Sequence, residues 1–174
     1  MTLQAAGKTD FASILSFYED VIDRTPGIDI YAQWRKGIHP SGQGIMSAIE
    51  AGSMYLYREN GNIVGAMVLT MRQSEEYHAV AWSQQLVDDE VAVIHMLGVS
   101  PDRQESGVGA EMVREAIRIA RANGKKSVRL DATTSNTPVH GFYERLGFVN
   151  RGERRLYVDN AAWMDFCFFE RSLL

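Results

Sequence analysis

A short segment in the middle of the chain has residues suited to binding an anion through its backbone. It is the turn Arg103–Ala110, in which Gly107 and Gly109 stand where an apolar run gives way to a helical pattern. Without Cβ atoms there, an anion can approach the chain closely, and the free N–H groups of the helix's first turn point at it with the positive end of the helix dipole. An ordinary strand-to-helix turn, with glycines for tightness, is the alternative interpretation.

Two better-known phosphate-binding motifs do not fit the spacing of this turn. A P-loop requires four residues between its glycines and then Gly-Lys-Ser/Thr, and the segment Gly107–Glu111 has neither feature. A dinucleotide-binding fingerprint requires a small residue at position 112, which is Met112. The turn therefore belongs to neither class of nucleotide site, and the residues that follow must indicate what it binds.

The chain beyond the turn continues as helix, strand and helix. Apolar residues recur at helical spacing directly after the glycines, and Ser127–Ala132 has the composition of a buried strand. A polar cluster then ends in Thr-Pro, which predicts a helix with Thr137 as its N-cap and Pro138 as its first residue. Asn136 precedes this helix, and Tyr143 lies within it.

In this order the motifs resemble the acetyl-CoA-binding core of the GNAT superfamily of N-acetyltransferases. The resemblance is carried by Gln104-x-x-Gly107-x-Gly109, by Asn136 before the next helix and by the segment Gly141–Phe148. It implies an α/β fold with a single mixed, mostly antiparallel central sheet of about six to seven strands flanked by helices. It also implies that strands four and five splay apart to hold coenzyme A, and that acetyl passes from acetyl-CoA to a primary amine by direct attack in a ternary complex.

The resemblance assigns the acetyl-CoA contacts to residues along this core. The turn would hold the pyrophosphate, and the backbone of the preceding strand would bind the pantetheine arm. Asn136 would bond the same arm, with helix capping as its other interpretation. The residues expected to contact acetyl-CoA are Leu97, Val99, Gln104, Gly107, Val108, Gly109, Ala110, Asn136 and Tyr143. No metal is required, because the thioester is already an activated donor.

Three residues have chemistry suited to the transfer itself. Tyr143 is the candidate general acid, because a phenol with a pKa of about 10 holds its proton at neutral pH; core packing is its other interpretation. His95 is a candidate base acting through water, expected on the same side of the sheet as Leu97 and Val99, or else a half-buried histidine satisfied by its neighbours. The Leu97 amide is the candidate oxyanion donor, with Gly98 suited to a bulge beside it.

The acceptor site is less determined by the sequence. In related folds it is bordered by the segment after the first helix and by the loop between the last two strands. These segments here contain the aromatic residues Tyr31, Trp34, Tyr157 and Trp163. These aromatic residues are consistent with an amine pocket, a homodimer interface or plain core. Many family members carry a glutamate where this chain has Val93, so a non-catalytic acetyl-CoA sensor or interaction module is the alternative function.

Composition predicts the class of protein. The 174 residues are 45% hydrophobic without a linker-like stretch, which predicts a single domain over residues 1–174. No apolar run approaches the ~20 residues of a membrane span, the first residues do not resemble a signal peptide, and one cysteine fits a reducing cytoplasm. Because 22 acidic residues exceed 18 Lys and Arg, we expect no nucleic-acid partner. The resemblance implies a small-molecule or peptide amine as acceptor.

Local patterns predict the elements that must position these residues. Capping and stop signals place early helices after Asp10 and over Tyr31–Lys36 and Ile45–Ala51. Strands are expected at Leu3–Ala5, Ser53–Arg58, Ile63–Met71, Val91–Val99, Leu156–Val158 and Ala162–Phe169. An Asn-Gly pair joins the second and third of these strands, the last two meet across Asp159-Asn160, and Gln73–Asp89 is expected to be a strand end and loop.

Overall fold

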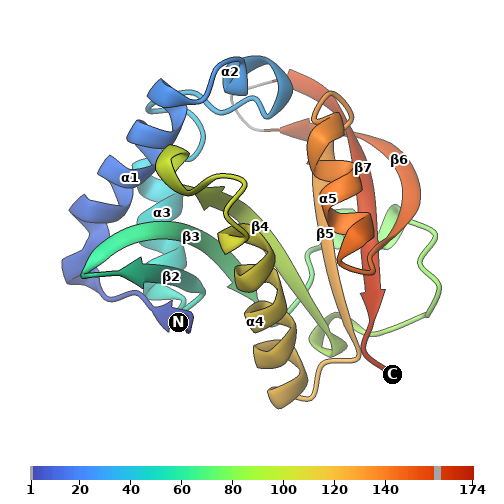
Figure 1. Cartoon of the computed structure of the whole chain (residues 1–174). Coiled ribbons are helices and arrows are strands. Elements are labelled where there is room, and N and C mark those ends of the chain that lie inside the picture. Colours follow the sequence, from blue (N-terminus) through green and yellow to red (C-terminus); the bar gives the residue numbers. More distant parts are fainter. Residues whose placement is uncertain (1, 159–161) are drawn as a thin grey trace.

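The computed structural model describes residues 2–158 and 162–174, and these residues form one seven-stranded sheet with helices on both faces (Figure 1). The strands are β1 (Gln4–Ala5), β2 (Met54–Glu59), β3 (Asn62–Thr70), β4 (Val91–Val99), β5 (Ser127–Thr133), β6 (Val149–Val158) and β7 (Ala162–Ser172). Their order in the sheet is β1-β2-β3-β4-β5-β7-β6. Neighbouring strands are antiparallel except for β4 and β5, which are parallel. The expected mixed, mostly antiparallel sheet is confirmed.

The helices divide between the two faces of the sheet. They are α1 (Phe11–Arg24), α2 (Ile28–Tyr31), α3 (Gly42–Glu50), α4 (Val108–Ala122) and α5 (Thr137–Arg145). The apolar stripe of α4 packs with α5 against one face, and α1 and α3 cover the other. Burial from both sides explains why the first half of β4 is a continuous apolar run rather than an alternating one.

The parallel strands β4 and β5 pair only over their first halves. Val91–Ile94 lies opposite Ser127–Leu130, and no pairing between the two strands continues beyond these described residues. Figure 1 shows β4 and β5 side by side at the lower end of the sheet and diverging toward the upper end. The expected splay is therefore present, and it opens at the carboxyl ends of the parallel strands.

A β-bulge interrupts β4 where the splay begins. Ala66 of β3 lies opposite Gly98, whereas Val68 lies opposite His95, so β4 carries one more residue than β3 over this stretch. Met96 absorbs the extra residue with a φ of 53°, a left-handed conformation that is uncommon for a residue with a side chain. The bulge therefore lies at Met96, two residues before the glycine that the sequence favoured.

The bulge reverses the facing of the residues after it. Leu97 and Val99 pack into the core beneath α4 and α5. His95 instead lies on the opposite face, with its ring 6.3 Å from the ring of Tyr77 and at right angles to it. The expectation that His95 shares a face with Leu97 and Val99 is wrong, because strict alternation along a strand fails across an inserted residue.

Several element boundaries differ from the sequence expectations. The short second helix is Ile28–Tyr31 rather than Tyr31–Lys36, because Gly27 starts it with a φ of 76° and Gln33 breaks it with a φ of 59°. Helix α5 begins at Thr137 with Asn136 as N-cap, one residue earlier than expected. Strands β6 and β7 are longer than expected. Strand β6 forms the sheet edge, and the polar residues that it exposes to solvent hide the apolar pattern by which a strand is recognised in sequence. The turn expected at Asp159-Asn160 lies outside the described residues.

A buried arginine anchors the loop between β3 and β4. Arg129 of β5 is 1% exposed and pairs with Glu170 of β7 at 2.9 Å. Its guanidinium also donates to the Gln73 side chain at 2.6 Å and lies 4.1 Å from the centre of the Trp82 ring. The loop therefore docks on the sheet and positions the short 3-10 helix η2 (Glu75–Ala79), which sequence patterns did not predict. Among the described residues, no helix is both long and apolar enough to cross a membrane.

Candidate functional site

The splay between β4 and β5 opens into a cleft of about 1150 Å³. It is walled by the end of α1, the segment after α2, the second half of β4, the end of β5, and α5. The sequence-predicted residues that line it are Tyr31, Trp34, His95, Leu97, Val99, Gln104, Asn136 and Tyr143. Residues far apart in the chain thus meet in one site. Within residues 2–158 and 162–174, no three His, Cys, Asp or Glu side chains form a group that could hold a metal ion.

The glycine turn begins α4 at the edge of this cleft. Gly107 is the N-cap with a φ of 90°, and no side chain caps the helix. No acceptor in the described part of the chain bonds the N–H groups of Val108, Gly109 or Ala110. A Cβ at Gly109 would lie 3.4 Å from the Val99 side chain and 3.5 Å from that of Phe142, and both of these residues line the cleft. The first-turn amides of α4 are therefore available beside the cleft wall.

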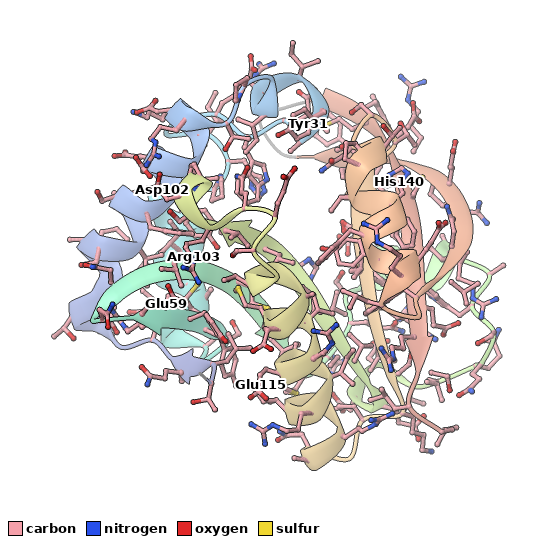
Figure 2. All side chains as sticks on the ribbon, in the orientation of Figure 1. Tyr31, Glu59, Asp102, Arg103, Glu115 and His140 are labelled. Atoms are coloured by element: carbon pink, nitrogen blue, oxygen red, sulfur yellow. The ribbon has the colours of Figure 1, made fainter. Side chains whose placement is uncertain are left out.

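Two side chains of the turn make protein contacts. Gln104 donates from its amide nitrogen to the Thr25 hydroxyl at 3.3 Å and to the Val99 carbonyl at 3.5 Å, which ties the end of α1 to the end of β4. Arg103 pairs with Glu59 at 2.6 Å, as Figure 2 shows. The guanidinium charge of Arg103 is therefore balanced within the protein, and the backbone amides remain as the turn's anion-binding groups.

Asn136 presents its side chain to the cleft. It is the N-cap of α5 by position, yet its side chain makes no capping hydrogen bond. Its backbone is fixed instead, because its N–H donates to the Thr133 carbonyl at 3.0 Å. Capping therefore does not account for this asparagine, and its amide group is left to face the cleft that it lines.

Tyr143 combines a buried ring with an unpaired hydroxyl. The residue is 6% exposed, and its ring packs against those of Phe142, Phe148 and Phe169 at centroid distances of 5.1, 5.7 and 5.9 Å. Its hydroxyl has no hydrogen-bond partner among the described residues, and the side chain lines the cleft. Burial raises the pKa of the Tyr143 phenol, and the nearby Asp131 carboxylate raises it further. The phenol is therefore protonated at neutral pH.

The backbone at the bulge has no register partner on either neighbouring strand. Met96 and Leu97 have no register partner in β3, and pairing with β5 has already ended at Ile94. The hydroxyl of Tyr18, from α1, donates to the Met96 carbonyl at 2.7 Å and holds this irregular segment in place. Leu97 thus presents its backbone at the point where the cleft passes between the strands.

His95 reaches the cleft from the opposite face of the sheet to Leu97. Its imidazole makes no hydrogen bond among the described residues, so its neighbours do not satisfy it. Burial lowers the pKa of His95 from about 6.5, and the charges of Asp131 and Glu76 partly oppose this shift. The imidazole is therefore neutral at physiological pH and able to accept a proton.

The sequence expectations missed an acid in the same region. Asp131 follows Leu130, the last β5 residue paired with β4, and its Oδ2 accepts a 3.2 Å hydrogen bond from the Tyr77 hydroxyl. Burial raises the pKa values of both the Asp131 carboxyl and the Tyr77 phenol. The available signal was an acidic residue inside a strand otherwise expected to be buried. Its significance depends on where pairing between the two strands stops.

The aromatic residues expected near an acceptor divide into two groups. Tyr31 (Figure 2) and Trp34 line the cleft: the Tyr31 carbonyl accepts hydrogen bonds from the hydroxyls of Ser135 and Thr133, and the Trp34 ring packs 5.6 Å from that of Tyr18. Trp163 does not line the cleft and is 60% exposed. Trp163 therefore lies outside the cleft lining, and its role at an acceptor site stays a prediction. Its ring contacts Tyr157, which does line the cleft.

Comparison with known proteins agrees with this geometry. The model of the acetyltransferase (GNAT) family matches residues 15–148. The chain is 36% identical over 70 residues to an uncharacterised N-acetyltransferase of Methanocaldococcus jannaschii, covering 40% of this chain and 31% of that protein. It is 33% identical over 82 residues to a mycothiol acetyltransferase of Corynebacterium glutamicum, covering 47% of this chain and 28% of that protein. The matched segments thus span less than a third of these relatives.

Solved structures share the whole fold. A GNAT-family acetyltransferase from Streptococcus agalactiae superposes with a TM-score of 0.79 at 15% identity, covering 99% of this chain and 95% of that chain. A putative acetyltransferase from Salmonella typhimurium, solved with its cofactor acetyl-CoA, gives a TM-score of 0.69 at 20% identity over 100% and 94% of the two chains. Since the family model covers most of the sequence, this chain belongs to the GNAT family of acetyltransferases.

Proposed function

We propose that this protein transfers an acetyl group from acetyl-CoA to a primary amine by direct attack in a ternary complex. The observation that supports this proposal most strongly is that the cleft passes through the sheet at the splay. The α4 start, Leu97 and Tyr143 lie on one face, and His95 and Asp131 lie on the other. A donor held on the first face and an amine held on the second would meet between β4 and β5, which is the geometry that a direct transfer requires.

The chain's free groups fit acetyl-CoA on the α4 face. The unpaired amides of Val108, Gly109 and Ala110 suit the pyrophosphate, because helix N-termini favour anions. The β4 backbone at Leu97 and Val99, beyond the end of pairing with β5, suits the amide groups of the pantetheine arm together with the Asn136 side chain. Gln104 fixes the wall between these two regions. The Salmonella relative, which contains acetyl-CoA, supports this assignment.

Three groups of the chain would then move protons or stabilise charge during the transfer. Acetyl-CoA supplies an activated thioester. His95 takes a proton from the bound ammonium, directly or through water, so that the amine nitrogen can form the new C–N bond. The Leu97 N–H donates to the carbonyl oxygen as negative charge develops on it. Tyr143 gives its hydroxyl proton to the sulfur as the C–S bond breaks, and the nitrogen of the new C–N bond then loses its second proton, by way of solvent, to restore the phenol. His95 releases the first proton to solvent, so the products are the amide, the free thiol and one proton.

Thiol release separates catalysis from the alternative of an acetyl-CoA sensor. Free thiol and acetylated amine are measured over a broad amine panel for the wild type and for Tyr143→Phe, which keeps the packed ring. We expect turnover by the wild type and a loss of ~10²- to 10⁴-fold in kcat for the variant, the usual contribution of a general acid. Acetyl-CoA should stabilise both proteins equally. Stabilisation of the wild type without turnover on any amine would instead support the sensor. Location in the cytoplasm and a homodimer stay predictions from the sequence.

A further inference from the structure

The face of the cleft that bears His95 has an unusual charge inventory. Among the described residues that line the cleft there is neither lysine nor arginine. Its carboxylates are those of Asp131 and Glu76, and its imidazoles belong to His39 and His95. Burial lowers the pKa values of both histidines, so neither supplies a positive charge at neutral pH. Bound ligands therefore meet negative charge with no protein cation to offset it.

From this inventory we propose that the acceptor is a cationic amine with an aromatic or apolar body and no carboxylate or phosphate group, and that its ammonium binds against Asp131. This substrate class rests on the acetyl-transfer function proposed above. An acceptor bearing its own carboxylate would place that anion beside Asp131 and Glu76 without a counterion, which disfavours binding.

Asp131 has a free oxygen for the ammonium. Its Oδ2 accepts from the Tyr77 hydroxyl, whereas its Oδ1 has no hydrogen-bond partner among the described residues. The Tyr77 ring also contacts the ring of His95, so one buried side chain fixes the carboxylate and the candidate base on the same face. An ammonium bound at Asp131 is therefore held beside the group proposed to accept its proton.

A second unpartnered group marks this place as a ligand site. Tyr143 is 94% buried, since 6% of its surface is exposed; it lines the cleft, and its hydroxyl has no hydrogen-bond partner among the described residues. The Asp131 carboxylate is close enough to raise the pKa of this phenol. A free carboxylate oxygen and a free phenol thus face the same space from the two sides of the splay, where the amine and the thioester must meet.

The remaining wall suits the body of such an amine. It is made by aromatic residues from separate elements, namely Tyr31, Trp34, Tyr157 and Phe166. Trp34 is held rigidly, because its ring packs against Tyr18 and lies 3.4 Å from where a Cβ on Gly98 would be. Aromatic faces attract an apolar body and favour a nearby ammonium through cation–π interaction.

A matched series of three acceptors tests this class. Phenethylamine, phenylalanine amide and phenylalanine share the aromatic body and the amine, and only phenylalanine adds a carboxylate. Thiol release from acetyl-CoA is measured for each with the full chain. We expect kcat/KM for phenethylamine and for the amide to exceed that for phenylalanine at least tenfold. Phenylalanine equal to or better than phenethylamine would overturn the inference.

The variant Asp131→Asn tests whether Asp131 causes the preference for acceptors without a carboxylate. It should raise KM for phenethylamine and reduce the preference over phenylalanine to less than threefold, while stabilisation by acetyl-CoA is kept. Asp29→Asn, which removes a surface carboxylate of α2 outside the cleft lining, should leave the preference unchanged. A preference that persists in Asp131→Asn would overturn the assignment to this residue. The wild-type series needs no variant, so it decides the substrate class even if Asp131→Asn fails to fold.

Different results would refute the acetyl-transfer function and the substrate class. A wild type that releases thiol with phenylalanine as its preferred acceptor retains acetyl transfer and refutes the cationic, carboxylate-free class. A wild type that neither gains stability from acetyl-CoA nor releases thiol with any acceptor refutes both.

Discussion

The Tyr18 hydroxyl of α1 donates a 2.7 Å hydrogen bond to the carbonyl of Met96, the residue of β4 that takes a left-handed φ. This contact joins a helix on one face to the single inserted residue that turns the rest of β4 toward the other. Because the bulge reverses the strand's facing, Leu97 lies on the α4 face of the sheet and His95 lies on the opposite face. The two-sided site therefore depends on one hydrogen bond and one irregular residue.

Removing this hydroxyl should impair both stability and catalysis. We expect Tyr18→Phe to cost about 1 kcal/mol of unfolding free energy, the net worth of a typical hydrogen bond. We also expect kcat to fall about tenfold, since displacement of reacting groups by ~1 Å can cost ~10²-fold. Urea denaturation and thiol-release kinetics measure the two effects. The control is Tyr57→Phe, which loses a 3.0 Å bond to Glu111 outside the cleft lining and should leave kcat unchanged. An equal fall in kcat for both variants would refute a positioning role for Tyr18.

The glycine turn can be tested against a glycine at the other end of the same helix. Gly107 and Gly124 have φ values of 90° and 69°, and a Cβ on either would meet nothing within 4 Å. Gly107→Ala and Gly124→Ala should therefore each cost ~1–2 kcal/mol of stability from backbone strain alone. Only Gly107→Ala should also weaken acetyl-CoA binding, measured by calorimetry on the folded proteins. Equal affinities in the two variants would show that the turn is structural and does not hold the pyrophosphate.

The sequence predicted the elements on the α4 face of the cleft well because they depend on local signals. The glycines at the start of α4, the asparagine before α5 and the tyrosine within it follow one another in an ordered pattern, and the structure brings all three motifs to the cleft edge. Apolar patterns likewise predicted β4 with its observed bounds and a helix at the position of α4. Signals of this kind need no knowledge of distant contacts.

The face of the cleft that bears His95 and Asp131 was predicted less well because it depends on long-range packing. Nothing local in the sequence identifies Met96 as the inserted residue, since its conformation is held by Tyr18, 78 positions earlier. Asp131 gains its importance only from the residue at which β5 leaves β4. Of the two aromatic residues expected near the last hairpin, Tyr157 lines the cleft and Trp163 does not.

The pH profile should report the neutral imidazole of His95. A base acts in its unprotonated form, so kcat/KM should rise with pH through the pKa of His95 and then level off. Burial lowers this pKa, while Asp131 and Glu76 oppose the shift and the neighbouring His39 is also kept neutral. The acidic fall should therefore begin only below pH ~6.5, the ordinary value of histidine. His95→Gln should lose this limb together with most activity. An unchanged limb in the variant would assign it to another group.

The buried Arg129–Glu170 pair should be essential for stability. Arg129→Met removes the partner of a carboxylate that is 2% exposed and releases the loop that carries Glu76 and Tyr77. Breaking a buried pair costs ~3–5 kcal/mol. We expect a loss of about 3 kcal/mol, near the lower end, because Arg151 and Ser83 still bond Glu170. Urea denaturation measures the loss.

A surface pair provides the comparison for Arg129. Arg118 pairs with Glu115 (Figure 2) at 2.9 Å on the outer side of α4, with 63% of its side chain exposed. Arg118→Met should leave the unfolding free energy nearly unchanged, because exposed ion pairs contribute little. If the two arginine variants lose the same stability, the loop is not anchored through the buried pair.

The binding of acetyl-CoA to the folded protein tests the central claim most directly. Thermal unfolding is followed while acetyl-CoA is added, with ATP at equal concentration as a polyphosphate control. Saturation at about one hundred times the dissociation constant adds about 2.7 kcal/mol of stability, which corresponds to a rise in Tm of roughly 5–10 °C for a chain of this size. We predict this rise with acetyl-CoA and a much smaller one with ATP. No rise at millimolar acetyl-CoA, or an equal rise with ATP, would contradict the assignment of the cleft as an acetyl-CoA site.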